Sequence, residues 1–125
     1  MIELILLIAS IIILYIVFPI VGTYTLIKTF IKWDLRILKI WFYRTAVAID
    51  QMGNTIGAPL FNDMLIITGG YKFGNTNETI SSVIGKNYRD NTLSRSGKLL
   101  RRMLDFIDAN HSLKSISEDE HNTRK

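Results

Sequence analysis

The chain has 125 residues, of which 48% are hydrophobic and 21% are charged, and its formal net charge at pH 7 is +4. This length allows one domain at most, and the absence of cysteine excludes disulfide bonds, thiolate metal sites and a catalytic thiol. The average composition hides a gradient, because apolar residues are concentrated in the first third of the chain and charged residues in the last third.

The first predicted element is a membrane-spanning helix. From Leu4 to Ile27 the sequence carries no charge, and a helix of this length rises about 36 Å, against about 30 Å for the hydrocarbon core of a bilayer. Apolar residues lie on all sides of this helix, whereas a surface helix keeps one polar face. The rest of the chain has too little apolar mass to bury it. A cleaved signal peptide would need a basic start and a shorter apolar run. We therefore predict an uncleaved transmembrane anchor over residues 1–27.

A basic amphipathic helix is predicted directly after the span, over residues 28–44. Only Glu3 precedes the span whereas several basic residues follow it, so the N-terminus is expected outside and the rest of the chain in the cytoplasm. On one continuous helix four of its five cations, all except Arg44, would share one side and the apolar residues the other, which suits a surface of anionic headgroups. The residues predicted at the membrane interface are Lys28, Lys32, Trp33, Arg36, Lys39, Trp41 and Arg44.

Asp34 does not fit this helix, because a continuous helix would place it among the apolar residues. We predict that Asp34 caps a new helix after the span, and a functional buried carboxylate is the alternative. Basic segments with aromatic residues also occur in nucleic-acid-binding proteins. Here the position next to a span explains every residue type, so no nucleic-acid partner is expected.

A small, loop-rich helical module is predicted over residues 45–111. Residues 45–54 can extend a helix, and residues 60–68 are apolar enough for a short helix or a strand but too short for a second span. Residues 75–85 are typical of a short helix, with polar cap residues first and Gly85 last. The residues expected to interrupt the helix that includes residues 45–54 are Gly53, Gly57 and Pro59.

The last predicted helix runs from Ser94 or Ser96 to Ala109. Its apolar side chains recur at the spacing of one helical face, which must be buried against something. This face is the predicted partner-binding surface, and it consists of Leu99, Leu100, Met103, Leu104 and Ile107. Beyond the helix, residues 112–125 are predicted to form a flexible polar tail.

No group of residues carries an enzyme signature. Asp105, Asp108 and His111 are spaced by threes, but they would need a fourth ligand from elsewhere to hold a metal ion, and such residues at a helix end more often face solvent or pair with arginine. Glu78 and Ser81 supply residue types used in acid–base or nucleophilic catalysis, yet no nucleophile motif accompanies them. We expect no catalysis, no cofactor and no metal ion.

Several short motifs lie between residues 46 and 111. They are Asp50-Gln51 with Asn54, Gly69-Gly70, Asn77-Glu78-Thr79-Ile80-Ser81-Ser82 with Gly85-Lys86, and Leu104-Asp105 with His111. Together they resemble a set of short proteins of tailed phages and prophages that share an (N/D)-E-T-I-S-S-x-x-G-K segment. In that set a Pro-Asp or similar pair precedes the segment and Asp-Pro-Gly-His often ends the region. This chain instead has Gly74-Asn75-Thr76 and Ala109-Asn110 at these places. The resemblance implies a phage-like source and no particular activity.

The expected protein is an all-α membrane protein with one transmembrane helix, a basic interfacial helix and a small helical cytoplasmic region. Two functions from different classes remain. The first is a membrane-anchored interaction protein at the cytoplasmic face of the bacterial inner membrane, with anionic lipid around its basic helix and a second copy or an unidentified protein as partner. The alternative is a holin-like or lysis-regulating permeability protein, although the long region after Arg44 exceeds what a pore-former needs.

Overall fold

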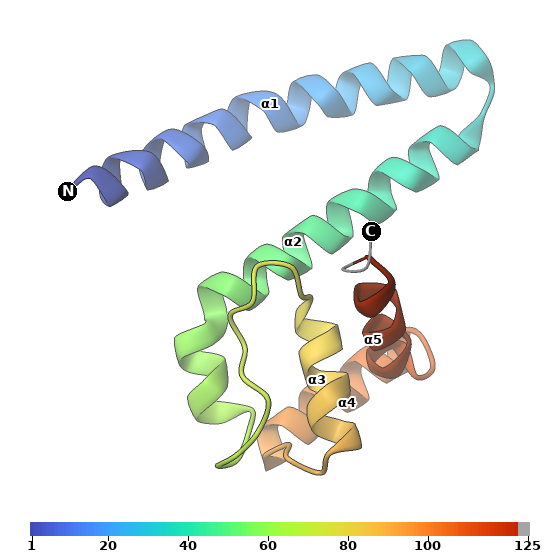
Figure 1. Cartoon of the computed structure of the whole chain (residues 1–125). Helices are drawn as coiled ribbons and strands as arrows, with labels where there is room; N and C mark the ends of the chain where they lie inside the picture. The colour runs from blue at the N-terminus through green and yellow to red at the C-terminus, as the bar shows by residue number, and fades with distance from the viewer. Residues whose placement is uncertain (123–125) are drawn as a thin grey trace. The chain divides into compact units, whose positions relative to one another are not determined.

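The structure is a computed structural model that describes the backbone of residues 1–122 and the side chains of residues 1–116. Within this part of the chain the regular structure is helical, apart from an isolated β-bridge between Ile66 and Leu93, so the all-α fold class is confirmed. The helices are α1 (Ile2–Lys32), α2 (Leu35–Met64), α3 (Ile80–Arg89), α4 (Arg95–Ile107) and α5 (His111–Asn122), as Figure 1 shows. The chain divides into two compact units, Met1–Thr45 and the part from Ala46 onward, and the boundary falls inside α2.

In the first unit a tight turn at Trp33 and Asp34 joins α1 to α2. Trp33 adopts the left-handed conformation, with φ 49° and ψ 34°, and its N–H and that of Asp34 donate to carbonyl groups in the last turn of α1. Asp34 Oδ1 then accepts a hydrogen bond of 3.0 Å from the backbone N–H of Arg36. The predicted capping role of Asp34 is therefore confirmed.

This turn corrects the prediction of one basic helix over residues 28–44. The cations predicted to share one helical face are divided between two helices. Lys28 and Lys32 lie in the last turns of α1, whereas Arg36, Lys39 and Arg44 lie in α2. No sequence pattern indicates a turn at Trp33, because the left-handed conformation is uncommon for residues other than glycine.

Trp41 of α2 packs against α1 within the first unit. Its ring centroid lies 5.6 Å from that of Phe18, and the indole also lies beside Gly22, where an added methyl group would be in ordinary van der Waals contact with it. Further along α1, Thr25 and Thr29 are buried, and each hydroxyl donates to the carbonyl group four residues earlier. The Trp41 side chain thus marks one contact between α1 and α2.

The second unit has a small apolar core between α2, α3 and α4. The segment after α2 pairs with the segment before α4, since Ile67 N–H donates to the Thr92 carbonyl oxygen at 2.9 Å. Helix α3 packs against both α4 and α5. At Gly85 the approach of α3 to α5 is so close that a methyl group there would overlap the Ser112 carbonyl oxygen. The buried core residues are Leu65, Ile66, Phe73, Val83, Ile84 and Leu93.

Two helix boundaries in the second unit correct the sequence predictions. Helix α2 continues through Gly53, Gly57 and Pro59 to Met64, because its last turns carry Phe61 and other side chains that pack against the core. Helix α3 begins at Ile80 rather than near residue 75, and Gly85 lies inside it. The residues before Ile80 are instead held in a loop by hydrogen bonds to α2.

At the end of the chain, the predicted helix that begins near Ser94 is confirmed, and the predicted flexible tail is wrong. Ser94 caps α4 by accepting a 3.1 Å hydrogen bond from the Gly97 N–H, which confirms the helix predicted from Ser94 or Ser96. Where a flexible tail over residues 112–125 was predicted, α5 occupies residues His111–Asn122, and Ser112, Ser115 and Ile116 are buried. Residues 123–125 of that predicted tail lie outside the described part of the chain.

Candidate functional site

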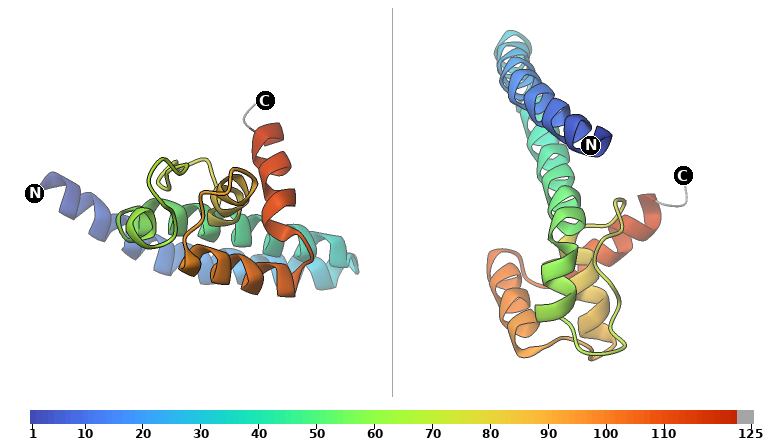
Figure 2. Two further views of the ribbon diagram at one scale, coloured as in Figure 1. Left: turned by 90° about the horizontal axis from the view of Figure 1, so that it is seen from below. Right: turned by 90° about the vertical axis from the view of Figure 1, so that its left-hand side faces the viewer.

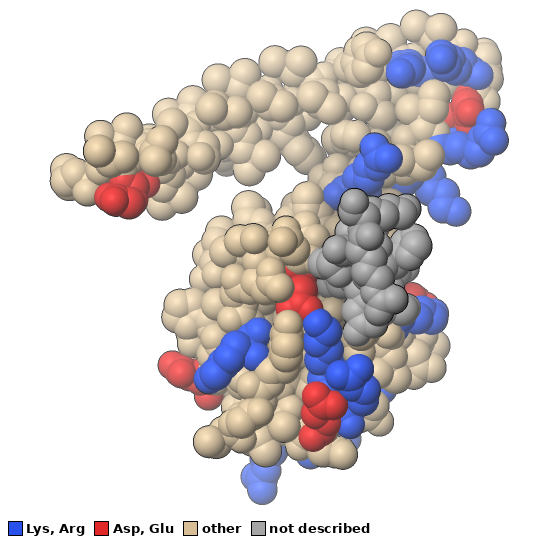
Figure 3. Space-filling view, viewed as in Figure 1, with Lys and Arg blue, Asp and Glu red and all other residues tan. Residues whose placement is uncertain are grey.

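Helix α1 is long and apolar enough to cross a membrane, and none of its most apolar stretch is buried by the rest of the chain. Figure 3 shows no charged side chain along the visible side of α1 between its acidic start and its far end, where basic side chains gather. At that end the pKa of the Asp34 carboxyl is lowered, first by the hydrogen bond from the Arg36 side chain and then by that from its N–H group. The predicted interface residues lie around this turn, but Trp41 is half-buried against α1.

Buried asparagine side chains hold the loop that follows α2. Asn54 is fully buried, and its Nδ2 donates to the carbonyl oxygens of Asn75 and Glu78 at 2.9 and 2.8 Å, while its Oδ1 accepts from Gly74 N–H at 3.1 Å. Asn62, two turns later, both donates to and accepts from the backbone of Phe73. The loop therefore lies along the C-terminal part of α2, as Figures 1 and 2 show.

Asn87 of α3 holds the other side of the same loop. Its Oδ1 accepts from Tyr71 N–H at 2.8 Å and from the Thr92 hydroxyl at 2.6 Å. Its Nδ2 donates to the carbonyl oxygens of Tyr71 and Val83 at 2.8 and 2.9 Å. The fully buried amide of Asn87 thus makes four hydrogen bonds, three with backbone groups and one with the Thr92 hydroxyl.

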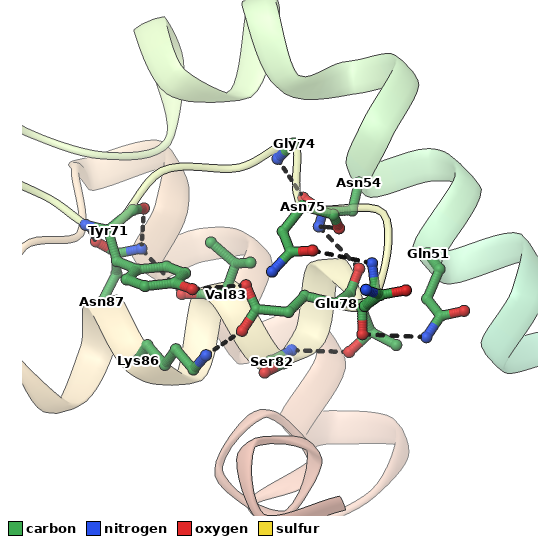
Figure 4. A network of polar contacts seen from close by, with 12 residues as sticks. Gln51, Asn54, Tyr71, Gly74, Asn75, Glu78, Ser82, Val83, Lys86 and Asn87 are labelled. Atoms are coloured by element: carbon green, nitrogen blue, oxygen red, sulfur yellow. Dashed lines mark hydrogen bonds and ion pairs between the residues drawn. The ribbon is translucent and has the colours of Figure 1, made fainter. Parts of the chain in front are cut away.

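Glu78, Lys86 and Tyr71 form the charged part of this network (Figure 4). The Glu78 side chain is only 5% exposed, and its carboxylate accepts from the Tyr71 hydroxyl at 2.8 Å and pairs with the Lys86 ammonium. That ammonium group also lies 4.5 Å from the centre of the Tyr71 ring. Burial raises the pKa of Tyr71, and its hydrogen bond to Glu78 raises it further. Burial lowers the pKa of Lys86, but the hydrogen bond and charge of Glu78 outweigh burial, so the net shift is upward.

Tyr71 and Lys86 therefore keep their protons near neutral pH. Both pKa shifts move away from pH 7, which favours a neutral Tyr71 and a charged Lys86. Asp50 of α2 also holds the start of α3, because its carboxylate accepts from the Ile80 N–H and the Ser81 hydroxyl, both at 3.0 Å. Sequence reasoning missed Tyr71 and Asn87, because no local pattern indicates their long-range partners.

Asp105, Asp108 and His111 do not converge on one point. Asp105 pairs with Arg101 at 2.9 Å, one helical turn before it. Asp108 pairs with Lys114 at 2.8 Å and lies 3.4 Å from the His111 Nδ1. The pKa of Asp108 is lowered by the hydrogen bond from Lys114 and then by that from His111. Each carboxylate thus has a cation of its own, and the side chains within residues 1–116 contain no metal-ligand cluster.

The predicted partner-binding face of α4 is divided between the core and the solvent. Leu100 and Leu104 are half-buried, and Leu100 packs against the core. The other three predicted residues, Leu99, Met103 and Ile107, are exposed. Phe106, which was not predicted although it lies one turn after Met103, is exposed as well. We call this exposed set the α4 surface: Leu99 (60% exposed), Met103 (60%), Phe106 (92%) and Ile107 (83%).

Basic residues of α4 border this surface. Arg95, Lys98 and Arg102 are exposed, and we call them the α4 cations. Arg101 differs from them, because it is half-buried, pairs with Asp105 and stacks on Tyr88, with 3.4 Å between its guanidinium carbon and the ring centre. The outward side of α4 therefore carries both apolar groups and cations that pair with no carboxylate among the side chains of residues 1–116.

Comparison with known proteins finds no matching family model, no similar curated protein and no similar solved structure. The two features of the chain itself that bear on its function are the exposed apolar helix α1 and the α4 surface.

Proposed function

We propose that the chain is a membrane-anchored interaction protein of phage-like origin that acts at the cytoplasmic face of the bacterial inner membrane without catalysis. Helix α1 is the anchor, because its side chains are apolar and exposed, and lipid is the solvent that makes such exposure favourable. The basic residues after it set the orientation with the N-terminus outside.

The α4 surface is the observation that carries the interaction role. The second unit has its own core, yet α4 leaves Phe106 and Ile107 almost fully exposed beside Leu99 and Met103. Contiguous exposed apolar groups with a polar border mark interaction sites on soluble domains. We therefore assign the docking of the second unit to this face of α4.

The polar network supports binding rather than catalysis. Its amides and its Glu78 carboxylate are engaged with backbone, Tyr71 and Lys86, and they hold the loop before α3 in place. A catalytic carboxylate would need a free oxygen within reach of a substrate. The network is best understood as the frame on which α3 and α4 are mounted.

Two aspartates placed in the α4 surface test this function. The variant Leu99→Asp with Met103→Asp should stay in the membrane pellet but lose the products, whether with lipid or with protein, that photocrosslinking from α4 in membranes gives with the original chain. Thr76→Asp, at an exposed loop position, is the matched control and should keep those products. Unchanged crosslinking of the double variant would refute the assignment. Collapse of the membrane potential on expression of the original chain would favour the holin-like alternative instead.

A further inference from the structure

The proposed function leaves open what covers the α4 surface. We infer that its occupant is an anionic lipid surface, so that α4 is a second, interfacial membrane contact of the same chain. This inference rests on the proposed function, because it takes α1 as the anchor that keeps the second unit near a bilayer. It assigns to α4 the lipid contact that the sequence had indicated only for residues 28–44.

The geometry of α4 matches a helix lying in a membrane interface. At about 100° per residue, the four side chains of the α4 surface fall within an arc of about 100°. The α4 cations occupy the next part of the circumference on one side. Gly97, Leu100 and Leu104 lie on the inward side, toward the second unit. A bilayer interface accepts such a helix with its apolar face about 5–10 Å into the headgroup boundary.

The charges of α4 select an anionic surface. In the part of the chain whose side chains are described, no carboxylate pairs with Arg95, Lys98 or Arg102. The nearest acid along the helix, Asp105, is already paired with Arg101. Long basic side chains next to an apolar face reach lipid phosphates while their stems stay in apolar surroundings. Cytoplasmic leaflets carry the anionic lipids that attract such groups.

A second copy of the chain is a poorer occupant for the same surface. In an antiparallel two-fold contact through this surface, the three α4 cations of one copy would lie along the same edge as those of the other and would repel them. A separate acidic protein would satisfy the charges, but it would have to be found in solution. A bilayer that already holds α1 is present beside the second unit at all times, which raises its effective concentration.

The absence of cysteine allows a direct test on the full chain. Ser96 is exposed on the apolar side of α4, and a Ser96→Cys variant carrying an environment-sensitive fluorophore leaves the α4 surface intact. The labelled chain is reconstituted into vesicles of phosphatidylcholine alone and of equal parts phosphatidylcholine and phosphatidylglycerol. Thr76→Cys, labelled in the same way, is the matched control in an exposed loop.

We expect the Ser96 label to shift its emission to the blue in the mixed vesicles, and to be quenched there several-fold more by a spin-labelled lipid than in neutral vesicles. The Thr76 label should report water in both. Adding Lys98→Gln and Arg102→Gln should return the Ser96 label to the neutral-vesicle signal without changing the helical circular dichroism.

Two results would overturn the inference. One is a Ser96 label that is as exposed to water as the Thr76 label in mixed vesicles. The other is equal shielding in both vesicle types that disappears when excess lipid dilutes the protein, which would identify a second copy as the occupant. Sedimentation of the same vesicles separates the two proposals: a chain absent from them disproves the anchor, whereas an anchored chain with a wet Ser96 label disproves only the contact of α4 with lipid.

Discussion

Replacing Lys86 by methionine tests the role assigned to the buried network most sharply. The substitution keeps the length and apolar stem of the side chain but removes the ammonium group that pairs with Glu78. Among the described residues, the Glu78 carboxylate, 5% exposed, would then keep only the Tyr71 hydroxyl as a donor. Removing one partner of a buried ion pair costs about 3–5 kcal/mol. Since Lys86 is still 13% exposed and Tyr71 remains, we expect the lower end, about 3 kcal/mol.

Hydrogen exchange of the α3 backbone amides measures this loss in the second unit. A loss of about 3 kcal/mol corresponds to about a hundredfold faster exchange of the most protected amides. Lys72→Met is the matched control, because Lys72 is exposed, and it should change exchange little. Adding Glu78→Gln to Lys86→Met should recover part of the protection, because a neutral amide needs no cation. A loss below about 1 kcal/mol, the value of an exposed ion pair, would refute the reasoning.

Other predictions follow from the same contacts. Gly85→Ala should lower the free energy of unfolding of the second unit by about 1–3 kcal/mol, because its methyl group overlaps the Ser112 carbonyl, and an unchanged Tm would contradict the close approach of α3 and α5. Asn54→Ala should cost about 3 kcal/mol in denaturant unfolding, because it leaves a buried N–H and two carbonyl groups without partners, and a loss within error would contradict that role. The pKa values of Lys86 and Tyr71 are raised on folding, so their contribution is complete below about pH 10 and falls as pH rises through the folded values. A Tm that rises in that alkaline range would contradict the sign.

The elements that the sequence predicted well are those whose signal is local. The uninterrupted apolar run of α1 and the period of apolar residues in α4 are visible in single segments. Ser94 is also a local signal, because a serine before a periodic run is a preferred cap. The exposure of Phe106 was beyond such reasoning, since periodicity places a residue on a face but does not say what covers that face.

The elements that the sequence mispredicted are stabilised by contacts far apart along the chain. A glycine in a helix interior costs about 1 kcal/mol and a proline about 3 kcal/mol, so a local estimate ends α2 before Pro59. Packing of Phe61 against Phe73, with 5.4 Å between ring centres, helps to offset that cost. Helix α5 carries little apolar periodicity, and it meets α3 at Gly85 through the Ser112 carbonyl group and the buried Ile116 side chain.

The candidate site likewise has a part that the sequence predicted and a part that it did not. The sequence shows which residue types are present, and Glu78 was singled out as a candidate. Its ion pair with Lys86 and the hydrogen bonds of Asn54 and Asn87 to the loop depend on the fold. Such long-range polar pairs leave no mark in composition or spacing. The division of the basic residues between α1 and α2 likewise depends on the single unusual conformation of Trp33.

Everything proposed for this chain depends on lipid surrounding α1, and cysteine accessibility measures that directly. Ile13→Cys, in the middle of α1, and Thr76→Cys, in the exposed loop, are each expressed in a chain that has no other cysteine. In opened membranes, with both surfaces in contact with water, a water-soluble maleimide should label Thr76→Cys rapidly and should label Ile13→Cys only after detergent is added. Equal labelling of the two positions before detergent would show that α1 lies in water or protein and would contradict the anchor.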